Sequence, residues 1–412
     1  MSERGVPPVT IKDIRVIMTA PNGLQLIVVK VLTSEPGLYG LGCATFTQRP
    51  LTVVTAIEQY LKPFCIGRDV DRIEDLWQAA IMSSYWRSGP VLNNAMSGVD
   101  EALWDIKAKR AGMPLYQLLG GKCREAVPVY SHASGDSFEE LEDDVRRLME
   151  MGFHYLRVGV GSPAFGTYGG SKMHTLTALN PAQRGTWETS PYVRTIPKMF
   201  EYLRVHLGDD LEIMHDVHER LPAIQGVWLA KAVEPYRLFF LEDLFAPEDN
   251  EYFRMVRAQS STPLAMGELY VNQAEYVPLI RERLIDFIRV HISDIGGLSM
   301  ARKLAAFCEF MGVRTAWHGP GDCSPVGHAV NMHLDLAVNN FGIQELALIR
   351  PEAEEVFPGC PQVHDGCMWP NDKPGHGVDI DEAAAAKYPY PEHMYNGGWP
   401  EVRRWDGTVI RP

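Results

Sequence analysis

The chain has 412 residues, of which 46% are hydrophobic and 22% charged. This composition excludes disordered and fibrous proteins, and the length predicts two or three domains, or one large barrel with an appendage. The formal net charge of −13 comes without any basic block, which argues against a nucleic-acid partner.

Membrane and secreted proteins are also disfavoured. No apolar run approaches the ~18–20 residues of a membrane span, and the polar start lacks the apolar core of a signal peptide. The seven cysteines are an odd number and include no C-x-x-C pair, so neither a disulfide framework nor structural zinc is expected. We therefore expect a protein of the reducing cytoplasm that does not bind membranes.

Residues 1–118 predict an α+β domain. Strand-like runs cover 9–19 and 24–45, with a turn at Pro21-Asn22-Gly23 between them. Apolar residues then recur at helical spacing in three stretches, which are 53–61, 72–85 and 92–110. Strands followed by a series of helices are typical of an α+β arrangement.

Residues 119–354 predict a (β/α)8 barrel. Eight short β-rich runs, most of them followed by a helix-like stretch, begin at 126, 154, 211, 237, 262, 286, 313 and 341. Their spacing is close to 26 residues except for one doubled step, which is the rhythm of this fold and disfavours a doubly wound sheet. The doubled step contains a Gly/Ser/Thr-rich segment, 161–190, that predicts a long loop over the site.

Residues 355–412 form a tail with little periodicity. Its aromatic residues are too many for a disordered segment, and they are Phe357, Trp369, Tyr388, Tyr390, Trp399 and Trp405. We expect the tail to pack back on the N-terminal domain or on a neighbouring subunit.

Three acidic residues stand at the ends of successive predicted barrel strands. Asp216, Glu242 and Glu268 are each 26 residues apart, which is one barrel unit, so their side chains should converge where barrel active sites lie. Carboxylates packed this closely repel one another unless they are protonated or bind a cation. Oxygen ligands favour Mg²⁺, or Mn²⁺, as that cation. The alternative is that each acid caps the helix that follows it.

The residues around these acids resemble a known family. The segments MHDVHERL, FFLEDLF, LAMGELY, AWHGPGD and FGIQE are similar to the enolase superfamily, and within it to the mannonate dehydratase group of the D-galactonate dehydratase family. The likeness extends to SYWRSGP, DEALWDIKAKRAGMPLYQLLGG and KPGHGVDIDE, and so covers nearly the whole chain. It implies a capping domain that closes the barrel and a homo-oligomer. It also implies one Mg²⁺ per subunit, held by Asp216, Glu242 and Glu268.

The resemblance implies that the chain dehydrates an acid sugar. A proton is removed next to the carboxylate of an aldonate such as D-mannonate or D-gluconate, the metal stabilises the enediolate, and loss of the β-hydroxyl leads to a 2-keto-3-deoxy acid. The second barrel run has no lysine to act as base. By resemblance, Arg157 and Tyr168 remove the proton, and His218 protonates the departing hydroxyl. A surface ion pair for Arg157, an exposed loop position for Tyr168 and a core position for His218 are the alternatives.

Further residues match substrate-binding positions of the family. They are Thr47, His132, Arg289, His318, Asp322 and Glu345. The guanidinium of Arg289 would supply the positive charge that an acidic protein needs to bind an anion. Thr47 stands where the family has asparagine and Pro320 where efficient mannonate dehydratases have alanine, so both departures put efficient mannonate turnover in doubt.

Two other functions stay open. The first is a ligand-binding or regulatory protein that keeps the site but has feeble turnover, as Thr47 and Pro320 suggest. The second is an epimerase or racemase in which His318, paired with Asp294, is the catalytic base. This function ranks lower because the second barrel run has no lysine.

Overall fold

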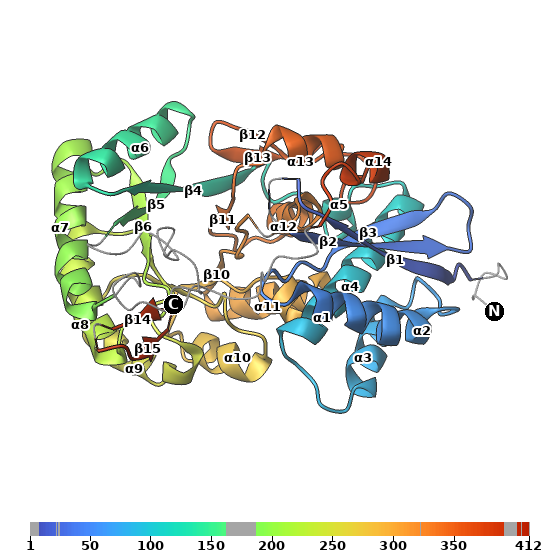
Figure 1. Ribbon diagram of the computed structural model, residues 1–412, viewed down its shortest axis with the longest axis horizontal. Helices are drawn as coiled ribbons and strands as arrows, with labels where there is room; N and C mark the ends of the chain where they lie inside the picture. Colours follow the sequence, from blue (N-terminus) through green and yellow to red (C-terminus); the bar gives the residue numbers. More distant parts are fainter. Residues whose placement is uncertain are drawn as a thin grey trace.

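The computed structural model describes residues 8–21, 23, 25–161, 187–321, 323–390, 402–404 and 406–411. These residues form an N-terminal α+β domain, blue in Figure 1, beside a (β/α)8 barrel, so the predicted fold class is confirmed. All seven cysteines are described, and none of them forms a disulfide. Among the described residues, no helix is long and apolar enough to span a membrane.

The N-terminal domain is a three-stranded antiparallel sheet packed against helices. The strands run in the order β1 (Ile11–Thr19), β2 (Leu26–Thr33) and β3 (Tyr39–Cys43). The helical segments are α1 (Pro50–Ala56), a π-helical turn (Ile57–Leu61), α2 (Lys62–Cys65), α3 (Ile73–Ser83), α4 (Pro90–Ala111) and α5 (Leu115–Leu118). A Cβ on Gly42 would lie 2.2 Å from the carbonyl oxygen of Gly98. Glycine in β3 therefore lets the backbone of α4 lie directly on the sheet.

Eight parallel strands form the barrel. They are β4 (Val127–Gly135), β5 (Tyr155–Val160), β6 (Glu212–Asp216), β7 (Leu241–Glu242), β8 (Leu264–Met266), β9 (Phe287–Ile288), β10 (Arg314–Thr315) and β11 (Gln344–Glu345). Each begins within one to four residues of its predicted run. Neighbours pair in sequence order from β4 to β10, and β11 pairs with β4. A bridge between Thr315 and Phe341 completes the closure.

Side chains fill the barrel below its carboxyl-terminal end. One buried cluster inside it consists of Tyr130, Met214, Phe240, Ala265, Phe287, Ala316 and Ile343. The interior is therefore a packed core, as in other barrels of this type, and any site must lie above it at the strand ends. Tyr130 reaches that level, because its hydroxyl contacts Glu242 and Arg289.

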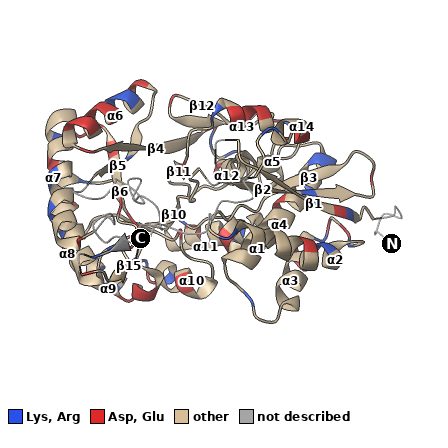
Figure 2. Cartoon of the chain, viewed as in Figure 1, with Lys and Arg blue, Asp and Glu red and all other residues tan. Residues whose placement is uncertain are grey.

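Helices surround the barrel on the outside (Figure 1). They are α6 (Phe138–Glu150), α7 (Thr189–Leu207), α8 (Ala223–Val233), α9 (Tyr252–Arg257), α10 (Gln273–Arg281), α11 (Leu298–Met311) and α12 (Pro325–Ala337). Short 3-10 turns lie at Glu234–Tyr236, Pro247–Asp249 and Ser293–Ile295. In the view of Figure 2, acidic and basic residues are interspersed over these outer helices.

The tail contacts both domains. In the described residues, it contains or follows two helices and four short strands. They are α13 (Pro351–Val356), β12 (Gln362–His364), β13 (Cys367–Trp369), α14 (Glu382–Ala385), β14 (Val402–Arg403) and β15 (Val409–Ile410). Val378 and Ile380 pack on Leu26 of the N-terminal sheet, as predicted for this tail. Strand β13 instead pairs with β4, and Arg411 bonds to Asp249 at 2.7 Å. The tail therefore contacts the barrel as well as the N-terminal domain.

A polar seam joins α3 and α4 to the barrel. The side-chain amide of Asn93 donates to the carbonyl oxygen of Val271 at 2.8 Å, and the backbone N–H of Ser299 donates to Asp100 at 2.8 Å. The indole of Trp77 donates to the carbonyl oxygen of Gly296 at 2.8 Å. Because Trp77, Asp100 and Ser299 are buried, these hydrogen bonds stabilise one position of the N-terminal domain over the loops of the barrel.

Candidate active site

Three acidic residues meet at the carboxyl ends of adjacent barrel strands. Asp216 ends β6 and Glu242 ends β7, and the two are direct partners in the parallel register. Glu268 follows β8 after Gly267, whose φ of 143° is readily adopted only by glycine. All three carboxylates are buried, and each lies at or just after the carboxyl end of its strand.

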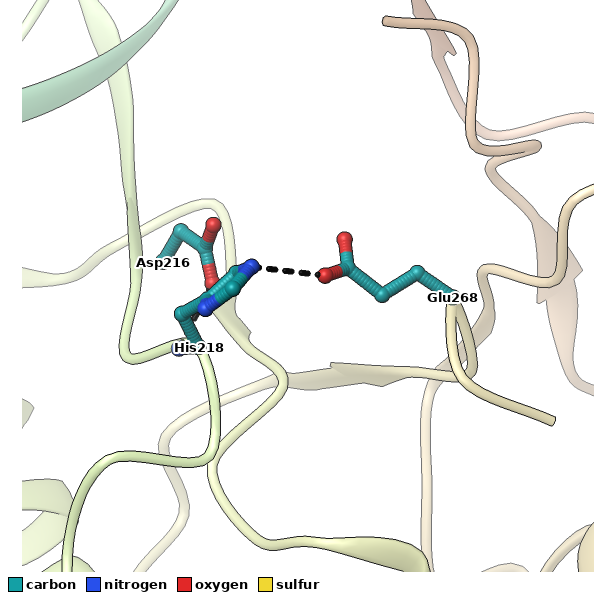
Figure 3. Close-up of side chains that lie close together, drawn as sticks. All are labelled: Asp216, His218 and Glu268. Atoms are coloured by element: carbon teal, nitrogen blue, oxygen red, sulfur yellow. Dashed lines mark hydrogen bonds and ion pairs between the residues drawn. The ribbon is translucent and has the colours of Figure 1, made fainter. Parts of the chain in front are cut away.

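The ligand atoms around Asp216 are close enough for one cation. Atoms of Asp216, His218 and Glu268 lie within 4.8 Å of one another, and so do atoms of Asp216, Glu242 and Asp243. Figure 3 shows the side chains of the first group turned toward each other. Oδ2 of Asp216 is buried and accepts no hydrogen bond within the described part of the chain. This oxygen lies among other carboxylates and 3.4 Å from Nη1 of Arg157, and its unused lone pairs fit a hard divalent cation.

Two arginines lie among the carboxylates. Nη1 of Arg157 is 2.7 Å from Glu242 and 3.4 Å from Asp216. Nη1 of Arg289 is 2.7 Å from Glu268, and its Nη2 is 2.6 Å from Glu345. A surface ion pair is thus the wrong description of Arg157, which is buried.

The charges of this cluster do not balance without a further cation. Its five buried acids are Asp216, Glu242, Asp243, Glu268 and Glu345. If all are ionised and His218 is protonated, the two guanidinium groups and the imidazolium offset three of the five negative charges and leave two. A divalent cation would neutralise this excess, which relieves the repulsion that burial magnifies.

The environment shifts the ionisation of these acids in opposite directions. Burial raises the pKa of Glu242 to about 8, against the opposing effect of Arg289 and Arg157. Burial would also raise the pKa of Glu268, but His218 and His318 outweigh it and hold that pKa well below its usual range. Burial also raises the pKa of Asp243 well above its usual range. Among the three acids predicted to bind metal, Glu242 is therefore the one that most requires a nearby positive charge to ionise.

His218 is built into a strained turn beside Asp216. Its φ is 53°, a left-handed conformation that is uncommon outside glycine, and the next residue, Glu219, has the same value. The backbone N–H of His218 donates to Oδ1 of Asp216 at 2.7 Å, and its Nε2 lies 3.1 Å from Oε1 of Glu268. Burial alone would lower the pKa of His218, but Glu268 raises it above its ordinary value. The imidazole is thus buried, oriented and favoured in its protonated form.

His132 and His318 complete the ring of polar groups. Nη2 of Arg157 donates to Nδ1 of His132 at 3.1 Å, so the other nitrogen carries the hydrogen and donates to Glu345 at 2.8 Å. Burial and the charge of Arg157 lower the pKa of His132. Nε2 of His318 is 3.3 Å from Oε2 of Glu268. These contacts bring both predicted histidines to the carboxylate cluster.

The other predicted site residues are placed differently. Tyr168 and Asp322 lie outside the described residues, as does most of the predicted loop at 161–190. Thr47 is half-buried in the loop after β3 and donates to Gln48 at 3.1 Å. Asp294 accepts a hydrogen bond from Asn94 at the seam with α4.

Three residues of the site were not predicted. Asp243 and Tyr130 both bond to Arg289, and His291 lies 2.9 Å from His318, between their Nδ1 atoms. Alternation along the strand places His291 on the same side as Arg289, and it is the only one of the three for which the sequence carries such a signal.

The chain is similar to known families and proteins over most of its length. A family described as "Enolase C-terminal domain-like" matches residues 140–384, and one described as "Mandelate racemase / muconate lactonizing enzyme, N-terminal domain" matches residues 5–120. The D-galactonate dehydratase family member RspA of Pantoea ananatis is 51% identical over 419 residues, which cover 98% of this chain and 99% of that protein. A D-galactonate dehydratase family member of Enterocloster bolteae is 50% identical over 404 residues, with the same coverage.

One solved structure is similar throughout. It is a crystal structure of an enolase from Pantoea ananatis with bound D-gluconate and Mg, with a TM-score of 0.92 and 50% identity. The alignment covers 98% of this chain and 100% of that one.

Proposed function

The chain belongs to the enolase superfamily and, within it, to the D-galactonate dehydratase family, and from that premise we propose that it is a Mg²⁺-dependent dehydratase of acid sugars. The substrate is a six-carbon aldonate, D-gluconate or D-mannonate, and the product a 2-keto-3-deoxy acid. The Pantoea ananatis enolase structure, which holds D-gluconate and Mg, supports this choice. The observation that carries the proposal is the excess of buried carboxylates around Oδ2 of Asp216.

Asp216, Glu242 and Glu268 would hold the Mg²⁺. Their carboxylate oxygens are the ligands that this ion prefers. Asp216 belongs to both groups of close ligand atoms, one with Glu268 and one with Glu242, and so links the three acids. When bound, Mg²⁺ supplies positive charge that stabilises the anion formed as the substrate loses its carbon-bound proton.

Arg157 and Tyr168 would remove that proton. Arg157 is fixed by Glu242 on one side and by His132 on the other, so its charge has one position in the site. A guanidinium near a phenol favours the phenolate, which is the form that accepts a proton. Tyr168 is assigned by resemblance, since it lies outside the described residues.

His218 would donate a proton to the departing hydroxyl. Its protonated form is favoured by Glu268, whose Oε1 lies 3.1 Å from Nε2 of the imidazole. A hydroxyl leaves readily only as water, so a buried and oriented acid supplies what this step needs.

The remaining polar groups would bind the substrate. His132 contacts Glu345 and His318 lies at Glu268, so both border the proposed metal site. Arg289 is fully buried and paired with carboxylates of the cluster, so its charge would act on the substrate through the field of the site and not by direct contact. Thr47 and Asp322 belong to the same proposed set on the resemblance alone. The hydroxyls of an aldonate are matched by this mixture of donors and acceptors.

The function is tested by incubating the purified protein with Mg²⁺ and a library of aldonates that includes D-gluconate and D-mannonate. We expect a 2-keto-3-deoxy product that disappears when a chelator removes the metal. Metal-loaded protein that forms no such product from any aldonate would reject the proposed activity.

A ligand-binding role with feeble turnover is the second candidate. It is favoured by Thr47 and Pro320, where the family has other residues, and by the engagement of the Thr47 hydroxyl with Gln48. Calorimetry that shows tight aldonate binding without product would support it. Turnover at ordinary enzyme rates, about 1 per second or faster, would exclude it.

Self-association accompanies this proposal. Tyr85 and Trp86 are 76% and 82% exposed on the N-terminal domain, an unusual position for two adjacent large aromatic residues. A second copy of the chain is the partner we expect there. Sedimentation of the intact protein and of Trp86→Ser would show a change in assembly size, whereas identical profiles would reject this surface.

A further inference from the structure

We propose that Asp243 is a positioning residue that sets the distances between the loops carrying His218, Glu268 and Arg289. The inference deepens the proposed function, on which its mechanistic meaning rests. Asp243 directly follows Glu242 at the end of β7 and is almost fully buried, with 1% of its surface exposed. Its φ of 40° is a left-handed conformation that a non-glycine residue keeps only where its surroundings hold it.

Asp243 bonds to three loops that follow three other barrel strands. Its carbonyl oxygen accepts from the backbone N–H of Glu219 at 2.8 Å. Its Oδ1 accepts from the backbone N–H of Gly267 at 2.9 Å. Its Oδ2 accepts from Nη1 of Arg289 at 3.1 Å. One residue thus ties the ends of β6, β8 and β9 to the end of β7.

Each of these bonds lies at or next to a proposed functional group. Glu219 follows His218, and Gly267 precedes Glu268, so both bonds act on the backbone that places these side chains. The third bond reaches Arg289 itself, whose Nη1 also contacts Glu268 at 2.7 Å. Small movements of such partners change metal affinity and activity, because a ligand must keep both its position and its direction.

A rival role for Asp243 is direct metal ligation. One of its oxygens lies within 4.8 Å of oxygens of Asp216 and Glu242. Both Asp243 oxygens, however, already accept a hydrogen bond from an N–H group. Oδ2 of Asp216 accepts none from the described residues and is the better placed ligand atom.

The experiment titrates Mg²⁺ into the metal-free full chain by calorimetry and compares Asp243→Asn with a matched change, Asp286→Asn. Asp286 likewise accepts from the backbone of a neighbouring strand, Leu264, at 2.8 Å and pairs with an arginine, Arg257. It does so at the opposite end of the barrel strands. We expect Asp243→Asn to weaken Mg²⁺ binding roughly 10- to 100-fold with one ion still bound, and Asp286→Asn to leave the affinity within about twofold.

Two results would overturn the proposal. Mg²⁺ affinity of Asp243→Asn within about twofold of the wild type would remove the positioning role. Complete loss of binding, equal to that of Asp216→Asn, would make Asp243 a ligand instead. Because the titration does not depend on turnover, it decides the role of Asp243 even if no aldonate is dehydrated.

A second variant guards against a folding defect. Asp243→Ser retains a small acceptor and places no amide N–H against Arg289, and we expect it to show the same weakening. If both Asp243 variants fail to fold while Asp286→Asn folds, Asp243 serves the fold and the positioning role is wrong.

Discussion

Nη1 of Arg157 lies 2.7 Å from Oε1 of Glu242, so the cation that we assign to proton removal is paired with a carboxylate that we assign to the metal. The same nitrogen is 3.2 Å from Glu345 and 3.4 Å from Asp216. The guanidinium of Arg157 therefore acts on both proton removal and the carboxylates of the proposed metal site. Turnover and Mg²⁺ affinity should respond differently when this guanidinium is removed.

Arg157→Gln should abolish most turnover without weakening Mg²⁺ binding. We expect product formation to fall about 10²-fold or more, as is usual when proton transfer loses its positioned group. Loss of a positive charge beside Asp216 and Glu242 should leave Mg²⁺ affinity unchanged or increased. Aldonate assays and metal calorimetry measure the two effects, with Arg146→Gln on the surface of α6 as the control. A fall in Mg²⁺ affinity would mean that the guanidinium holds the carboxylates in place.

His218→Asn should separate protonation of the leaving group from metal binding. Asparagine tolerates the left-handed conformation at this position, where φ is 53°, and its backbone N–H can still donate to Asp216. We expect turnover to fall by roughly 10²- to 10⁴-fold while Mg²⁺ binding persists. The exposed His206→Asn is the comparison. Near-normal turnover in His218→Asn would show that another group supplies the proton.

Tyr130→Phe should lower the affinity for Mg²⁺ while leaving the barrel folded. The hydroxyl of Tyr130 donates to Glu242 at 3.2 Å and accepts from Nε of Arg289 at 3.1 Å, whereas its ring belongs to the inner apolar cluster. Removing only the hydroxyl leaves two buried charged groups with one fewer partner. We expect a loss of Mg²⁺ affinity of about 10-fold with an unchanged far-ultraviolet circular dichroism spectrum. An unaltered affinity would show that Tyr130 only fills space.

Asp100 should make stability depend on pH at the seam between the domains. Burial raises its pKa from 3.8 to about 7, against the hydrogen bonds that it accepts from Ser299. Between these values the folded state binds more protons than the unfolded state, so the contribution of Asp100 to the free energy of unfolding falls as the pH rises from about 4 to about 7.

The test compares urea unfolding of the wild type and Asp100→Asn across this range. The variant has no such titration, so the free energy of unfolding of the wild type minus that of the variant should decrease toward pH 7. Because both chains share all other titrating groups, their effects cancel. A difference that is the same at every pH would contradict the assignment to Asp100.

The barrel was predictable because eight short β-rich runs recur at a spacing near 26 residues, with one doubled step. The lengths of the strands were not, and the run predicted from Arg237 pairs as a strand only at Leu241 and Glu242. Paired length depends on where neighbouring strands face each other, which a pattern of apolar residues along one strand does not record.

The site was predictable to the extent that it follows strand spacing. Asp216 and Glu242 are partners in the register because they are one barrel unit apart. Asp243 was missed because two acids end the same run and alternation points only the first into the barrel. Its bonds to Gly267 and Arg289 depend on a left-handed turn that no residue type in this run signals.

The path of the tail over the two domains could not be predicted from the sequence and is seen only in the tertiary structure. The aromatic residues of the tail predict packing, and Phe357 lies in one buried cluster with residues of the N-terminal sheet. The bond from Arg411 to Asp249 spans 162 residues and joins two polar side chains, which have no periodic pattern to reveal them. Long-range ion pairs of this kind are set by the fold and not by local sequence.

The most direct test of the central claim is anomalous diffraction from crystals soaked in Mn²⁺, which takes the same oxygen ligands as Mg²⁺. The account predicts one strong peak at about 2.1–2.3 Å from carboxylate oxygens of Asp216, Glu242 and Glu268. A peak bound by other residues, or no peak at this end of the barrel in fully loaded crystals, would contradict the metal site on which the proposed dehydration depends.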